Sequence, residues 1–200
     1  NEMKKICEKL NINIFEAIEA AGTKPFGFQK FYPGPGYGGH CIPIDPFLLH
    51  WKAKKLGADA KFIKLSGLIN EKMPYQISKR IENYCKKVKC KKILIIGVAY
   101  KKNVDDVRES PGLRIIDYLN RQKFDVIYHD PYIKSLPNTR EFKIKKRSIK
   151  LSKKILSKNI VIIVTDHDKL DYEFIKKNSK FIFDCRGRFK RNYPNKVLQI

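Results

Sequence analysis

The sequence has no apolar run long enough to cross a membrane and no cysteine pattern typical of a disulfide framework. Its longest uncharged apolar stretch, residues 93–100, is far shorter than the roughly 20 residues that a membrane-spanning helix needs. The five cysteines are odd in number and lack the paired short spacings of disulfide-rich domains or zinc sites. The first residues also lack the charged and apolar regions of a signal peptide. We therefore expect a protein of the reducing cytoplasm with no membrane span and no metal site.

Acidic residues are scarce relative to basic ones. The chain has 20 Asp and Glu against 43 Lys and Arg, which gives a formal net charge of +23. Such a charge attracts polyanions, so nucleic-acid binding is one hypothesis, and it predicts DNA affinity with a steep salt dependence. Lysine is spread over almost every segment, however, and a basic surface equally suits a substrate that carries a diphosphate. The composition therefore does not favour nucleic acid as the partner.

Apolar periodicity divides the 200 residues into a helical part and an α/β part. Apolar side chains recur at steps of three and four residues, which predicts helices over 2–10, 14–21, 45–56 and 62–88, with a Gly- and Pro-rich loop over 24–46. Beyond residue 90, buried-strand runs (91–100, 125–131, 158–167, 180–187) alternate with helical stretches (111–121, 151–158, 170–178). The predicted fold class is therefore α/β, with a helical segment over 1–88 and a Rossmann-like parallel sheet, covered on both faces, over 89–200.

The loop sequence FYPGPGYGGHCIPIDP, residues 31–46, has Gly34, Gly36 and Gly39 at the G-x-G-x-x-G spacing. A dinucleotide fingerprint needs a strand directly before its first glycine and a helix after its last. Here prolines precede and interrupt the glycines, and His-Cys-Ile-Pro follows them. Gly97 does follow a strand run, but it is one glycine of the three. Neither segment therefore predicts an NAD-binding loop in this chain.

The same glycines point instead to Cys41 as a candidate nucleophile. Glycine allows close approach and positive φ, so these residues could hold a thiol in an exposed loop walled by peptide N–H groups. A thiol beside a helix N-terminus is a candidate nucleophile, and the alternative is a small core residue. Asp45 is predicted to cap the next helix, with Pro46 at its first position, and it could also act as a base. We expect the ring of His40 to point away from Cys41, as neighbouring side chains do in an extended loop.

Two separate segments resemble the nucleotide-sugar 6-dehydrogenase family. They are FYPGPGYGGHCIPIDPFLLHWKA with FIKLSGLINEKMP, and GVAYKKNVDDVRESPGLRIIDYL with YHDPYI. This family oxidises the C6 alcohol of a nucleotide-sugar to a carboxylate with two NAD⁺, and the PGPGxGGHCIPIDP form most resembles its UDP-N-acetylglucosamine branch. The resemblance covers only the later half of the family's chain. It therefore implies that an NAD domain, and a segment with a catalytic lysine and asparagine, precede residue 1.

The resemblance also implies roles for individual residues. Cys41 would capture the aldehyde intermediate as a thiohemiacetal and then carry a thioester, while Asp45 would support the water that cleaves it. Arg108 would reach the NAD cofactor across a domain cleft. The residues implied to contact the nucleotide-sugar are Phe31, Tyr32, Gly34, Gly36, Gly38, Gly39, Tyr100, Lys101 and Arg186. Asn103 departs from the family pattern, because an aspartate is usual there, and Asp184-Cys185-Arg186-Gly187 replaces the commoner D-x-R-N.

The resemblance assigns a function to each part. Residues 1–88 would form a central segment with the cysteine loop, and the helix over 62–88 would pack at the interface of a homodimer or larger homo-oligomer. Residues 89–200 would form the UDP-sugar-binding domain. The expected function is part of an NAD-dependent UDP-sugar 6-dehydrogenase. The alternative is a non-catalytic fragment for nucleotide-sugar binding and dimerisation that is inactive without the NAD domain.

Overall fold

A five-stranded parallel sheet organises the C-terminal part of the chain in the computed structural model, which describes residues 1–139, 141–189, 192–193 and 195–200. The spatial order is β2-β1-β3-β4-β5, and every neighbouring pair is parallel. The central strands β1 and β3 are apolar and almost wholly buried, as expected where helices cover both faces. The strands are β1 (Lys92–Ile96), β2 (Asp125–His129), β3 (Ile160–Ile163), β4 (Ile182–Asp184) and β5 (Val197–Gln199).

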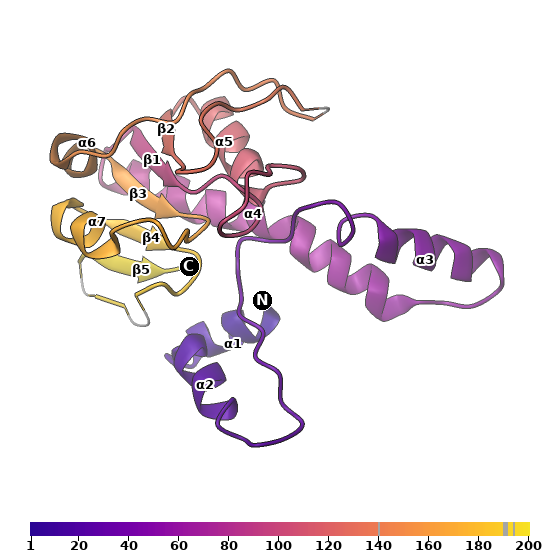
Figure 1. Ribbon diagram of the computed structural model, residues 1–200. Helices are drawn as coiled ribbons and strands as arrows, with labels where there is room; N and C mark the ends of the chain where they lie inside the picture. The colour runs from indigo at the N-terminus through magenta and orange to yellow at the C-terminus, as the bar shows by residue number, and fades with distance from the viewer. Residues whose placement is uncertain (140, 190–191, 194) are drawn as a thin grey trace.

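Helices cover both faces of this sheet (Figure 1). On one face, α5 (Pro111–Arg121) and the second half of α4 (Lys61–Lys87) pack with Ile93 and Ile95 of β1. On the other face, α6 (Lys153–Lys158) and α7 (Tyr172–Asn178) pack with Leu94 and Ile96. Successive residues of β1 thus face opposite cores, as the pleat of a strand requires. The predicted α/β fold is confirmed.

The N-terminal part lies beside this domain as two helical groups (Figure 1). Helices α1 (Glu2–Lys9) and α2 (Ile14–Ala21) form one group, and α3 (Asp45–Lys55) packs along the first half of α4 to form an arm that projects away from the sheet. All of the large apolar side chains that are exposed in the described part of the chain fall between Met3 and Val88. The N-terminal part therefore presents an extensive apolar surface.

Most predicted elements form within two residues of their predicted ends, but β1, β3 and β4 end three or four residues earlier than predicted. Two further details differ. The edge strand β5 is not predicted, because its three residues give too short a pattern. Asp45 is not the cap of α3: Ile44 holds that position without a side-chain hydrogen bond, Asp45 is the first helical residue and Pro46 is the second. The reason is a preceding turn, in which the Cys41 carbonyl accepts hydrogen bonds from the N–H groups of Ile44 and Asp45.

Candidate active site

The glycine loop docks closely on the segment that follows β1. The N–H of Gly39 donates to the Arg108 carbonyl at 2.8 Å. A Cβ added at Gly38 would lie 2.7 Å from Tyr100 Cβ and 2.8 Å from the Glu109 carbonyl oxygen, and one at Gly39 would lie 2.9 Å from the Tyr100 ring. Glycine is thus needed here for packing within the protein. The sequence predicts that peptide N–H groups of this loop surround the thiol and are free to bind. That prediction is wrong at Gly39, whose N–H donates to the Arg108 carbonyl.

Two further glycines fit the loop against other elements. Gly34 lies beside Arg186, and a Cβ there would come within 2.8 Å of a guanidinium nitrogen. Gly36 adopts φ +119°, and a Cβ there would come within 3.0 Å of the Asn70 carbonyl oxygen on α4. The N–H of Gly34 also donates to the Asn1 side chain at 3.1 Å. The loop is therefore positioned by α1, α4 and the C-terminal domain together.

Cys41 is exposed at the end of this loop. Its carbonyl accepts a hydrogen bond from the Asp45 N–H at 2.8 Å. The chain between the Cys41 thiol and the Asp45 carboxyl group therefore forms a single turn. The His40 Nδ1 atom lies 4.0 Å from the Cys41 Sγ atom, so the His40 ring faces the thiol. The expectation that it points away is wrong, because the segment is a turn rather than an extended strand.

Arg108 lies against the thiol loop through its carbonyl, which accepts from the Gly39 N–H, and its guanidinium is paired with a neighbouring carboxylate. Its guanidinium Nη2 and Nε atoms contact the Asp106 carboxylate at 2.7 and 3.0 Å. The hydrogen bond from Arg108 holds the pKa of Asp106 below its usual value. The hydrogen bond to Asp106 in turn raises the pKa of Arg108. The guanidinium is itself exposed and so accessible to an anionic group.

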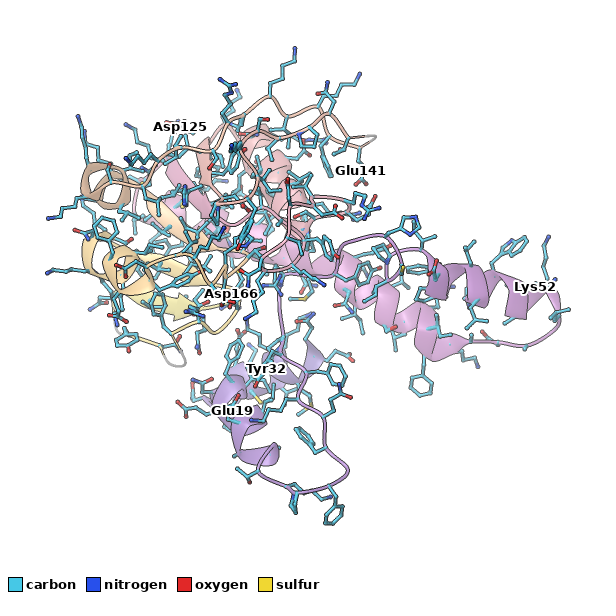
Figure 2. The ribbon with its side chains drawn as sticks, viewed as in Figure 1. Glu19, Tyr32, Lys52, Asp125, Glu141 and Asp166 are labelled. Carbon is cyan, nitrogen blue, oxygen red and sulfur yellow. The ribbon has the colours of Figure 1, made fainter. Side chains whose placement is uncertain are left out.

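A cleft of about 780 Å³ lies between α2 and the carboxyl ends of the strands. Three of the residues that the sequence suggests for substrate binding, Tyr32, Lys101 and Arg186, line it together. Figure 2 labels Tyr32 and Glu19 on the α2 side and Asp166 on the sheet side. The rest of the lining is Phe15, Glu16, Glu19, Pro33, Lys102, Asp166, Gly187 and Arg188. The four basic side chains of the sheet side make the cleft suitable for a diphosphate.

Arg186 is anchored at the base of this cleft. Its side-chain Nε atom donates to the Val164 carbonyl at 2.7 Å, and its backbone N–H donates to the Asp184 carboxylate at 3.0 Å. Burial lowers the pKa of Arg186 and raises the pKa of Asp184. An arginine remains charged in such surroundings, so its free nitrogens can donate to an anion.

The predicted site residues do not all share this cleft. Phe31 lines a second cleft, between α1, α2 and the first turns of α4. Cys41 is absent from the described lining of both clefts. Sequence reasoning overlooked Asp166 and Arg188, which follow β3 and β4. The rule that ligands bind beyond the carboxyl ends of parallel strands, where the strand order reverses, could have identified them.

Comparison with known proteins relates these features to a family. Residues 1–72 match the central domain of the UDP-glucose/GDP-mannose dehydrogenase family, and residues 94–191 match the UDP binding domain of the same family. The chain belongs to the UDP-glucose/GDP-mannose dehydrogenase family. The sequence resemblance is thereby confirmed.

Relatives and solved structures agree with this assignment. The chain is 36% identical, over 96% of its length, to a UDP-N-acetyl-D-mannosamine dehydrogenase of Methanocaldococcus jannaschii, of which it covers 43%. It is 31% identical, over 94% of its length, to an NDP-N-acetyl-D-galactosaminuronic acid dehydrogenase of Ralstonia solanacearum, again covering 43%. The structure of the UDP-D-ManNAc dehydrogenase from Pyrococcus horikoshii superposes with a TM-score of 0.75 at 30% identity, over 96% of this chain and 44% of that one. The chain thus spans less than half the length of these relatives.

Two structural observations accompany the family assignment. No helix in the described part of the chain is long and apolar enough to cross a membrane. Within the same residues, no group of three or more His, Cys, Asp or Glu side chains is arranged to hold a metal ion.

Proposed function

We propose that this chain supplies the thiol and the UDP-sugar-binding surface of an NAD-dependent nucleotide-sugar 6-dehydrogenase. The observation that carries the proposal is the docking of the loop that holds the exposed Cys41 thiol on Tyr100, whose neighbour Lys101 lines the basic cleft. The family assignment supports the same reaction class. We assign residues 1–88 to the thiol loop and subunit contacts and residues 89–200 to nucleotide binding.

The UDP part of the substrate would lie in the basic cleft. Lys101 and the anchored Arg186 would hold the diphosphate, because cations confined in a partly buried cleft bind phosphates strongly. Tyr32, with its hydroxyl donating to Glu19, would offer an aromatic face to the nucleotide. Gly34, Gly36, Gly38 and Gly39 would set the loop conformation, and Phe31 would contact the substrate only from the neighbouring cleft. Tyr100 would link the two regions, since its ring supports the thiol loop.

The thiol would carry out the second half of a four-electron oxidation. Cys41 as thiolate attacks the C6 aldehyde, forming a C–S bond while the carbonyl oxygen takes a proton. Loss of hydride from C6 then gives a thioester, and water, deprotonated with help from Asp45, cleaves it to the carboxylate and the free thiol. Each of the two hydrides would be accepted by a separate NAD⁺, bound in turn. Arg108, exposed and clamped by Asp106, fits a contact to that anionic cofactor.

The sugar is the finer part of the proposal. We propose an N-acetylated UDP-hexosamine, with UDP-N-acetylglucosamine as the first candidate from the loop sequence. The names of the relatives, which include UDP-N-acetyl-D-mannosamine and NDP-N-acetyl-D-galactosaminuronic acid dehydrogenases, support an N-acetylated sugar. A cytoplasmic location would supply both this substrate class and NAD.

We also propose that the enzyme is a homodimer or larger homo-oligomer through its N-terminal part. The support is the apolar surface of α3 and α4, where Leu49 is 59% exposed and Phe62 is 88% exposed. A Leu49→Glu variant should dissociate in sedimentation velocity, whereas Lys52→Glu, on the same helix and also exposed, should not. A monomeric unsubstituted protein would contradict this proposal.

The experiment that tests the proposed reaction counts hydrides. The chain joined to the NAD domain expected before residue 1 would be given NAD⁺ and one UDP-sugar at a time, with NADH and sugar product measured together. We expect two NADH for each carboxylate formed, and a Cys41→Ser variant that stalls before the carboxylate. Unimpaired carboxylate production by Cys41→Ser would contradict the role of Cys41. NADH production by the 200-residue chain alone would contradict the need for the additional domain.

A further inference from the structure

A buried carboxylate and a buried histidine tie together three loops at the carboxyl ends of β1, β2 and β3. Asp130, after β2, accepts hydrogen bonds from Val98 and Ala99 at 2.7 and 3.1 Å. It also accepts from the N–H groups of Tyr132 and Ile133 in its own loop. His167, after β3, contacts the same carboxylate through Nε2 at 3.0 Å, and both side chains are fully buried. The pair has no role in the chemistry proposed above.

The Asp130–His167 pair forms hydrogen bonds with the backbone just before and just after the Tyr100–Lys101 segment. Asp130 holds the two residues that precede Tyr100, and the Nδ1 atom of His167 accepts a hydrogen bond from the Asn103 N–H at 2.9 Å, just beyond Lys101. Asn103 adopts φ +64°, a conformation that asparagine tolerates better than most residues. The Tyr100–Lys101 segment, which would contact substrate, is therefore held on both sides by the buried Asp130–His167 pair.

Asn103 adds a second clamp at the same position. Its side-chain amide donates to the Asp168 carboxylate at 2.6 Å, and its side-chain oxygen accepts from the Asp168 N–H at 3.0 Å. An aspartate at position 103 would bring two carboxylates together. Asn103 is thus suited to its Asp168 partner in this chain.

We propose that His167 is a positioning residue for nucleotide-sugar binding: by accepting the hydrogen bond of the Asn103 N–H, it fixes the loop that presents Tyr100 and Lys101 to the substrate. The inference rests on the proposed function, since it assumes that this loop contacts a UDP-sugar. His167 acts through the loop and does not line the cleft among its described residues.

The tautomer of His167 follows from its two partners. Because Nδ1 accepts from a backbone N–H, the ring carries its proton on Nε2, where it donates to Asp130. Burial alone would raise the pKa of Asp130, but the bonds from His167 and the backbone outweigh it, so its pKa lies below its usual value. Asp130 is therefore an ionised acceptor for the Nε2 proton.

Two conservative substitutions separate the two bonds of His167. An asparagine can place an oxygen where Nδ1 stands, so His167→Asn keeps the acceptor for Asn103 and loses the donor to Asp130. A glutamine can place a nitrogen where Nε2 stands, so His167→Gln keeps the donor and loses the acceptor. His129→Gln, at the end of β2, serves as the control, because His129 contacts the Ile149 carbonyl rather than the loop.

The test measures the binding of UDP-N-acetylglucosamine by calorimetry at one fixed, mildly basic pH. We expect His167→Gln to bind roughly fivefold to tenfold more weakly than the unsubstituted chain, the effect of about one lost hydrogen bond. His167→Asn should bind within about twofold of the unsubstituted chain, because Asp130 keeps its backbone N–H donors. His129→Gln should bind as the unsubstituted chain does.

Each outcome decides between the claims. Unchanged binding by His167→Gln, or equal losses in both His167 variants, would overturn the positioning role. Thermal unfolding of each variant checks folding. If His167→Gln does not fold, a clear loss of binding by His167→Asn, which keeps the acceptor for Asn103, would still contradict the role. No binding by the unsubstituted chain would contradict the proposed function and the inference with it. Binding by the unsubstituted chain with unaffected variants would contradict the inference alone.

Discussion

Replacing Gly38 by alanine should undock the thiol loop from the C-terminal domain. The new Cβ would lie 2.7 Å from Tyr100 Cβ and 2.8 Å from the Glu109 carbonyl oxygen. Neither atom is the end of a flexible side chain, so relief requires the backbone of one segment to move. Forcing extra volume into such a contact typically costs about 1–3 kcal/mol. For a chain of this size, that corresponds to a fall in melting temperature of roughly 2–12 °C.

Gly27 and Gly39 provide matched controls for this substitution. Gly27 has φ +69° and no atom within 4 Å of an added Cβ, so Gly27→Ala should carry only the strain of positive φ, about 1 kcal/mol. Gly39 has φ +92° as well as contact with the Tyr100 ring, so Gly39→Ala should be the most destabilising of the three. Urea unfolding gives the stabilities, and the rate at which Cys41 reacts with a thiol reagent reports the docking of the loop. If Gly38→Ala matched the unsubstituted chain in both measurements, the docking account would be wrong.

Substitutions at three further positions test other contacts. Asn103→Asp should weaken UDP-sugar binding and lower the free energy of unfolding by about 1 kcal/mol, because a carboxylate would face Asp168. Asn103→Gly should bind the UDP-sugar better than Asn103→Asp does. Arg186→Lys should weaken UDP-sugar binding roughly tenfold in calorimetry, since lysine lacks the planar fork by which Arg186 bonds the Val164 carbonyl while presenting its other nitrogens; equal affinity would refute this. The hydrogen bonds from Lys86 and then Tyr118 lower the pKa of Glu82 from 4.5 to about 2, so its stabilisation should be present above about pH 4.5 and lost toward pH 2. Urea unfolding of Glu82→Gln should therefore show a flatter acid branch, and an unchanged branch would contradict the assignment.

The sheet could be predicted from sequence because its strands are short, apolar and buried on both faces. The run around Ile93 to Ile96 needs no knowledge of distant residues, and the long apolar stripe of α4 likewise indicates a helix. The order of strands and the short edge strand β5 depend on pairing between distant segments. Those features had to come from the structure.

The candidate site was only partly accessible to the same reasoning. The Cys41 loop is one continuous motif, so its thiol and glycines could be named from sequence together with the family resemblance. Glu16 and Glu19 reach the cleft only because α2 folds back toward the sheet, and no local pattern marks them. The orientation of His40 and the start of α3 depend on a single tight turn at Cys41, which the predicted capping role of Asp45 did not anticipate.

The proposed reaction depends on a thioester at Cys41. The chain joined to the NAD-binding domain that the family resemblance implies, with Asp45→Asn to slow hydrolysis, would be mixed with NAD⁺ and the UDP-sugar that it oxidises, quenched in acid and digested for mass spectrometry. We expect the mass of a nucleotide-sugar acyl group on the peptide that contains Cys41, while Cys7, Cys85, Cys90 and Cys185 remain unmodified. Turnover to the carboxylate with the acyl group on another cysteine, or with no adduct on Cys41 at any time, would contradict the account.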